Sequence, residues 1–142
     1  MKGSVALIKG ILFDSDGTLL NTNELIYKSF VHMFKEVLNK ELKKDEITSL
    51  YGKPLEVSLN KYSKDEKIIQ NMIRTYRKYN IDNHDRMCRT FEGIPELLRL
   101  LKEKKIKCGI VTSKKKDVAE RGLQITDILK FMDVIITPED TE

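Results

Sequence analysis

The feature that most constrains this chain is an apolar run that ends in two acids spaced two positions apart. Residues 11–20 read ILFDSDGTLL, with the acids at Asp14 and Asp16. Consecutive apolar residues predict a buried strand, and Gly17 predicts a chain reversal. An acid at the end of such a strand has no packing role, and ligands of parallel sheets bind at the carboxyl edge. We therefore expect a functional site at Asp14 and Asp16.

Two carboxylates in this position suit a particular chemistry. A carboxylate fixed at a strand end can be a nucleophile, and one two residues later can give and take a proton. Together they offer the hard oxygen ligands that Mg²⁺ prefers. A plain Asp-Gly hairpin turn is the structural alternative, but it does not need two acids after an apolar strand. An EF-hand loop fails because Leu19 stands where its invariant glycine belongs.

Composition narrows the class of protein. With 142 residues, 40% hydrophobic and 34% charged, the chain has room for one domain or for a small core with an insertion. No apolar run is long enough to span a membrane, and two cysteines without metal spacing, Cys88 and Cys108, indicate reduced thiols in a cytoplasmic protein. The net charge of +4 is mild. We expect the lysine runs to be solvated faces and expect no nucleic-acid partner and no membrane.

Periodicity predicts strands near both ends and helices between them. Apolar positions at helical spacing and glycine or proline breaks give the order of elements. The predicted strands are residues 8–14, 106–112 and 133–137. The predicted helices are residues 22–38, 40–49, 63–79, 95–105, 117–123 and 126–131, with a polar loop over 80–89.

This order predicts an α/β fold with a parallel sheet, because the strands are separated by helices. Residues 21–90 carry only helices and are too long for a loop, so we expect an inserted all-helical cap. The expected domains are residues 1–20 as the first part of the core, 21–90 as the cap and 91–142 as the second part of the core.

A second candidate site follows the predicted strand 106–112. That strand ends in Thr112, and Ser113 comes next. Hydroxyl groups and main-chain N–H groups at the start of a helix can bind a phosphate group. A simple helix N-cap explains the same residues equally well from the sequence alone. In a parallel sheet the end of this strand is expected beside Asp14.

Residues 11–20 resemble motif I of the haloacid dehalogenase superfamily of phosphohydrolases, and residues 110–112 resemble its motif II. The resemblance implies an incomplete Rossmann-like parallel core with a helical cap, and Mg²⁺ as cofactor. It implies that Asp14 is the nucleophile that becomes an aspartyl-phosphate and that Asp16 is the general acid/base. Asp14 and Asp16 would bind the metal, the latter through its main-chain carbonyl. Phosphate binding is implied for Thr112 and Ser113, in a site completed by Gly17 and Thr18.

Three stretches, residues 21–26, 76–81 and 91–93, look most like the bacterial inorganic pyrophosphatase branch, close to phosphoglycolate phosphatases. The implied partner is a small phosphorylated substrate or pyrophosphate. Gly52 falls where such caps place a substrate-specificity loop, and Lys53 and Arg77 are candidate cations of the cap for a highly charged substrate. A phosphoglycolate phosphatase or a sugar-phosphate mutase is the near alternative.

The chain departs from the family pattern after residue 137. The lysine of motif III and the acids of motif IV have no counterpart. Lys114, Lys115 and Lys116 are not assigned to the first role, and Glu139, Asp140 and Glu142 are not assigned to the second. Without a following strand, the strand at residues 8–14 is expected at an open sheet edge, so we expect the 142-residue chain to be marginally stable or to form a homodimer through that edge. A non-catalytic fragment that acts as a binding or interaction module is therefore a second hypothesis.

Overall fold

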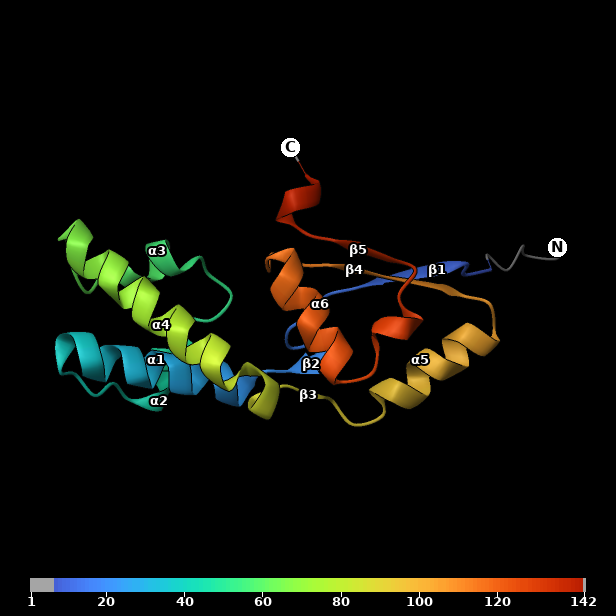
Figure 1. Cartoon of the computed structure of the whole chain (residues 1–142), viewed down its shortest axis with the longest axis horizontal. Coiled ribbons are helices and arrows are strands. Elements are labelled where there is room, and N and C mark those ends of the chain that lie inside the picture. Colours follow the sequence, from blue (N-terminus) through green and yellow to red (C-terminus); the bar gives the residue numbers. More distant parts are fainter. Residues whose placement is uncertain (1–6, 142) are drawn as a thin grey trace, which may run out of the picture. The chain divides into compact units, whose positions relative to one another are not determined.

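A computed structural model describes residues 7–141, which form two compact units. The core unit comprises the residues up to Thr22 and those from Cys88 onward, and the helical unit is Asn23–Met87. The chain thus leaves the core unit after its first strands and returns after the helices (Figure 1). Each unit has its own cluster of buried apolar residues.

The core unit contains a three-stranded parallel sheet, as the sequence predicts. Its strands are β1 (Gly10–Phe13), β4 (Lys107–Val111) and β5 (Val134–Ile136), in the order β1-β4-β5. Phe13 pairs with Ile110, so the residues that follow both strands lie at the same edge. Within the described residues β1 is a terminal strand, which confirms the expected open edge.

Two helices cover one face of this sheet, α5 (Ile94–Glu103) and α6 (Lys116–Ile125) (Figure 1). Leu98 of α5 and Leu123 of α6 are fully buried in one cluster with Ile110 of β4. Pro95 lies in the first turn of α5, where its missing N–H costs no hydrogen bond. Two 3₁₀ turns complete the unit, η1 (Leu129–Phe131) and η2 (Pro138–Asp140).

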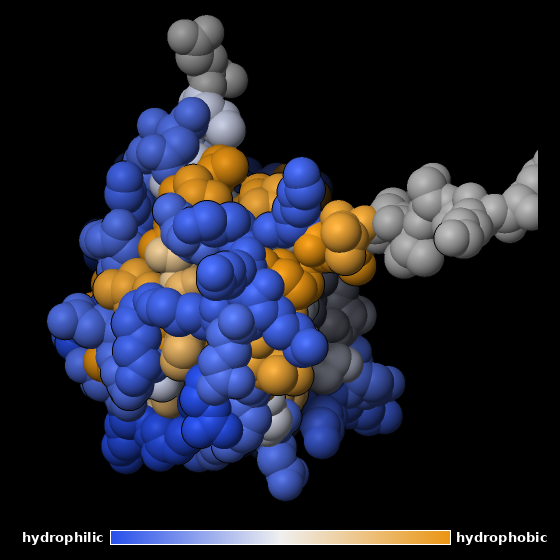
Figure 2. Space-filling view, turned by 90° about the vertical axis from the view of Figure 1, so that its right-hand side faces the viewer, coloured by the Kyte–Doolittle hydropathy of each residue, from blue (hydrophilic) through white to orange (hydrophobic). Residues whose placement is uncertain are grey.

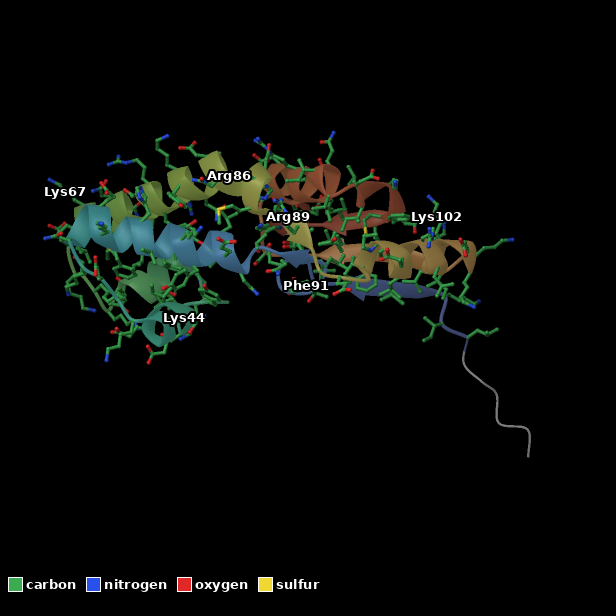
Figure 3. All side chains as sticks on the ribbon, turned by 90° about the horizontal axis from the view of Figure 1, so that it is seen from below. Lys44, Lys67, Arg86, Arg89, Phe91 and Lys102 are labelled. Atoms are coloured by element: carbon green, nitrogen blue, oxygen red, sulfur yellow. The ribbon has the colours of Figure 1, made fainter. Side chains whose placement is uncertain are left out.

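A short antiparallel pair closes the core unit where the chain leaves and re-enters it. β2 (Leu20–Asn21) pairs with β3 (Arg89–Thr90), and Figure 3 labels Arg89 and Phe91 on the returning chain. The sequence analysis predicts no strand here, because two-residue strands carry no alternation to detect.

The helical unit consists of four helices, α1 (Asn23–Leu38), α2 (Lys44–Thr48), α3 (Leu55–Leu59) and α4 (Glu66–Met87). Its core is made by the predicted apolar stripes of α1 and α4. Phe30, Met33 and Phe34 from α1 are buried with Met72 from α4.

Two predictions for this unit are wrong. Residues 80–87 are not a loop but the last turns of α4, since no glycine or proline interrupts them and Lys78 pairs with Asp82 one turn on at 2.8 Å. The short helix α3 is missed, although Pro54 directly precedes its first turn.

In the part of the chain that the structure describes, no helix combines the length and the apolar character needed to cross a bilayer.

Candidate active site

The loop after β1 is held mainly by main-chain hydrogen bonds to the Ser15 carbonyl. The Ser15 C=O accepts N–H groups from Thr18, Leu19 and Leu20 at 3.3, 3.0 and 3.0 Å. Leu19 and Leu20 are buried, so they anchor the loop in the core while the acids stay at its outer side. Gly17 has a φ of +79°, a conformation that an L side chain rarely adopts. Residues 17–20 therefore fix the backbone that carries Asp14 and Asp16.

Asp14 directly follows the last residue of β1 and is exposed. One of its carboxylate oxygens, Oδ1, accepts the N–H of Ser15 at 2.8 Å. This bond restrains the carboxylate, and the described residues offer it no other recorded partner. An exposed, oriented carboxylate at this edge is placed as a nucleophile needs to be.

Asp16 is only partly exposed and has two donors on one oxygen. Its Oδ1 accepts the Thr22 hydroxyl at 2.8 Å and the Lys114 ammonium at 2.9 Å. Thr22 is buried and directly follows β2. The carboxylate is thus tied to both parts of the core unit, the one before and the one after the helical insertion.

Thr112 and Ser113 lie beside Asp14, as the parallel sheet predicts. All three line a shallow hollow of about 320 Å³ at the carboxyl edge, together with Thr137 and residues around it. Helix α6 begins at Lys116, and its N-cap, Lys115, makes no side-chain capping bond. Thr112 and Ser113 are therefore not the N-cap of this helix. Instead the Thr112 Oγ1 accepts the N–H of Lys114 at 3.2 Å.

Gly17 and Thr18 are exposed, but their main-chain amides are used inside the loop. Gly17 N–H donates to the Leu20 C=O at 2.9 Å, and Thr18 N–H donates to the Ser15 C=O. Both residues therefore shape the loop that carries Asp16.

The residues expected to select the substrate all belong to the helical unit. Gly52 is exposed with a φ of +72°, and Lys53 next to it is exposed. Arg77 is exposed on α4 and lies 3.7 Å from the Glu56 carboxylate. It also lines a hollow of about 440 Å³ along one side of α4.

The two acids after β5, Glu139 and Asp140, accept hydrogen bonds from neighbouring residues. The Asp140 carboxylate accepts the main-chain N–H and the hydroxyl of Thr137, both at 2.9 Å. The Thr137 N–H in particular, then its hydroxyl, lowers the pKa of Asp140. Glu139 accepts the N–H of Lys116 at 3.2 Å. Both carboxylates thus accept hydrogen bonds from residues close to them in the core unit.

Two residues of this site, Thr22 and Lys114, are missed by the sequence reasoning. Each contacts Asp16, but neither lies within the short motif around it. The pairing of β1 with β4 brings Lys114 to Asp16 across 98 positions. In the sequence, the one indication of this contact is that a basic residue directly follows Thr112 and Ser113.

Comparison with known proteins agrees with this geometry. The family model described as haloacid dehalogenase-like hydrolase matches residues 11–142. The "Putative pyrophosphatase PpaX" of Clostridium perfringens is 50% identical over 135 residues, which are 95% of this chain and 62% of that protein. The "Pyrophosphatase PpaX" of Bacillus cereus is 39% identical over 95% of this chain and 62% of its own length. The chain thus spans about three fifths of these relatives.

Solved structures show the same fold. A haloacid dehalogenase-like hydrolase from Streptococcus pneumoniae superposes with a TM-score of 0.82 at 28% identity, over 92% of this chain and 61% of that one. The match to the family model extends over nearly the whole chain and includes both acids of the loop after β1. This chain belongs to the haloacid dehalogenase-like hydrolase family.

Proposed function

We propose that this chain carries the nucleophile-bearing part of a Mg²⁺-dependent phosphohydrolase. The observation that carries the proposal is the placement of Asp14, exposed at the carboxyl end of β1 and in one hollow with Thr112 and Ser113. A nucleophilic carboxylate and phosphate-binding hydroxyls then face the same small space. The curated relatives named pyrophosphatase support the same reaction class.

In the proposed reaction the Asp14 carboxylate attacks the phosphorus atom of the substrate. The bond from phosphorus to the leaving oxygen breaks, and Asp16 gives that oxygen a proton. Asp16 then takes a proton from water, and the water oxygen attacks the aspartyl-phosphate. Orthophosphate leaves, and Asp14 is restored. The hydroxyl of Thr112 and that of Ser113 hold the transferred phosphoryl group.

The oxygen donors of this site fit Mg²⁺. Among the described residues no group of three or more acidic, histidine or cysteine side chains converges. Mg²⁺ does not need one, since it commonly binds one or two carboxylates together with water and substrate phosphates. The Asp14 carboxylate and the Asp16 main-chain carbonyl would hold it. The bound ion would neutralise charge on the phosphoryl oxygens.

Pyrophosphate is the substrate that we propose first, because relatives at 50% and 39% identity are named for it. We further propose that Gly52, Lys53 and Arg77 of the helical unit contribute to the choice of substrate. Lys53 and Arg77 are exposed cations, which suits a highly charged anion. A cytoplasmic location fits the two buried cysteines of the core unit.

A substrate panel with matched variants tests the proposal. Purified chain is incubated with pyrophosphate, phosphoglycolate or a sugar phosphate, with Mg²⁺ or EDTA, and orthophosphate release is measured. We expect Mg²⁺-dependent release that is fastest with pyrophosphate and is abolished by Asp14→Asn. Asp127→Asn is the control, because Asp127 is an exposed acid with a φ of +58°, a conformation that asparagine tolerates. Equal rates for the two variants would refute the role of Asp14.

A further inference from the structure

Lys114 is a charged group in the candidate site to which neither the motifs nor the proposed reaction assigns a role. Its ammonium lies 2.9 Å from the Asp16 Oδ1, and the two side chains are 25% and 24% exposed. The pair therefore lies at the border between core and solvent. A cation held in such a place has lost part of its hydration and interacts strongly with any anion that enters.

The main chain of Lys114 also makes a hydrogen bond within the site. Its N–H donates to the Thr112 Oγ1 at 3.2 Å. That hydroxyl oxygen therefore accepts a bond from within the loop, and its proton can be donated outward. Thr112 lines the hollow that also contains Asp14. Lys114 thus connects the phosphate-binding hydroxyl to the loop that carries Asp16.

The Lys114 ammonium also has N–H groups that are not used in its bond to Asp16. A lysine ammonium carries three N–H bonds, and one is directed at Asp16. No other acceptor is recorded for it among residues 7–141. Asp16 does not depend on Lys114 alone, because the Thr22 hydroxyl binds the same oxygen at 2.8 Å. The ammonium can turn toward an incoming anion while Thr22 keeps Asp16 in place.

We propose that Lys114 is a substrate-binding residue whose ammonium rests on Asp16 and binds the oxygens of the phosphoanion when it enters. This inference rests on the proposed phosphohydrolase function and adds a cation to its site. It favours substrates with two adjacent phosphate groups, because a compact ammonium is attracted most by the anion of highest charge density.

Binding of orthophosphate and of pyrophosphate tests this role without relying on turnover. Orthophosphate is the reaction product and is not consumed, so its affinity for the intact chain can be measured by calorimetry with Mg²⁺ present. Pyrophosphate is measured with Ca²⁺ in place of Mg²⁺ to slow hydrolysis. The variants are Lys114→Gln, Lys114→Arg and the control Lys115→Gln. Lys115 is the exposed neighbour and makes no side-chain capping bond.

We expect Lys114→Gln to weaken orthophosphate binding about tenfold or more, the usual effect of losing one charge-assisted hydrogen bond. The loss for pyrophosphate should be larger. Lys114→Arg should restore most of the affinity, and Lys115→Gln should bind as the unmodified chain does. A purely structural role would not give rescue by arginine at unchanged thermal stability.

The outcomes separate this inference from the proposed function. If the unmodified chain binds phosphate and Lys114→Gln binds it equally well, the role of Lys114 is refuted while the phosphohydrolase proposal stands. If the unmodified chain binds neither anion, both are refuted. Should Lys114→Gln fail to fold, Lys114→Arg is compared with Lys115→Gln instead. If Lys114→Arg folds but no longer binds phosphate, the result counts against the proposal.

Discussion

The helical unit and the core unit bury their apolar residues in different ways. In the helical unit α1 and α4 face each other, and the exposed apolar residues, such as Val57 and Ile81, are separate positions on different helices. In the core unit, within residues 7–141, α5 and α6 pack on one face of the sheet and no helix covers the other. On the other face Leu12, Val111 and Val134 are 65%, 44% and 46% exposed.

These three residues belong to one surface, the open face of the sheet. Leu12 and Val134 meet over Gly109, where an added Cβ would lie 2.8 Å and 2.6 Å from their side chains. Parallel sheets are covered on both faces almost without exception. The apolar surface of the core unit is also visible at the end where the chain enters β1 (Figure 2). The unit that holds the candidate site therefore exposes three adjacent apolar side chains on one face of its sheet.

Removing the largest buried side chain of the helical unit should have the largest effect on stability. Phe34 is fully buried among aromatic neighbours, and its ring lies 4.7 Å from that of Tyr62. We expect Phe34→Ala to cost about 3–5 kcal/mol. The measurement is the urea midpoint of helicity by circular dichroism. Val57→Ala, at an exposed position, is the control and should cost about 0.5 kcal/mol or less.

The two faces of the core sheet should respond differently to the same kind of truncation. Ile110 is fully buried on the covered face, so Ile110→Ala should cost about 2–5 kcal/mol. Leu12→Ala, on the open face, should cost about 1 kcal/mol or less.

Thiol labelling reports this difference, because both cysteines, Cys88 and Cys108, are buried in the core unit. Burial raises the pKa of the Cys108 thiol, and the nearby Asp133 carboxylate adds to the effect, so labelling requires opening. Ile110→Ala should speed labelling strongly and Leu12→Ala only slightly. Equal acceleration by both variants would contradict the distinction between the two faces.

The open face and the free edge of β1 should make the chain self-associate. We propose a homodimer through this surface, and sedimentation velocity should show a concentration-dependent shift toward twice 16.5 kDa. Leu12→Lys should reduce association by placing a charge on the open face. Ile81→Lys, on the helical unit, is the matched control and should leave association unchanged. A monodisperse monomer at all concentrations would contradict this proposal.

A smaller expected effect is a loss of core-unit stability at low pH. The Asp133 carboxylate accepts the N–H of Cys108 at 2.9 Å and lies 3.2 Å from the Lys107 ammonium. The Cys108 amide chiefly, and then Lys107, lower the pKa of Asp133. A lowered pKa contributes stability above the unfolded value of about 3.9, and this is lost as the pH falls through the folded value. The urea midpoint of unfolding should therefore fall below about pH 4, and Asp133→Asn should flatten that dependence.

Sequence reasoning succeeded where one local pattern determines the structure. The apolar run before Asp14 specified β1, and the order of strands and helices specified a parallel sheet with Thr112 beside Asp14. It failed where tertiary contacts decide. Residues 80–87 look like a loop by polarity, yet they extend α4 with His84 buried. The ion pair of Lys114 with Asp16 depends on strand pairing between distant segments, which no short motif contains.

The central claim is that Asp14 is a phosphoryl acceptor, and covalent trapping tests it most directly. The chain is mixed with ³²P-labelled pyrophosphate and Mg²⁺, quenched in acid, in which acyl phosphates survive, and digested into peptides. We expect label on the peptide that contains Asp14, lost in alkali and absent from Asp14→Asn. Release of labelled orthophosphate that continues in Asp14→Asn, or label on a peptide without Asp14, would contradict the account.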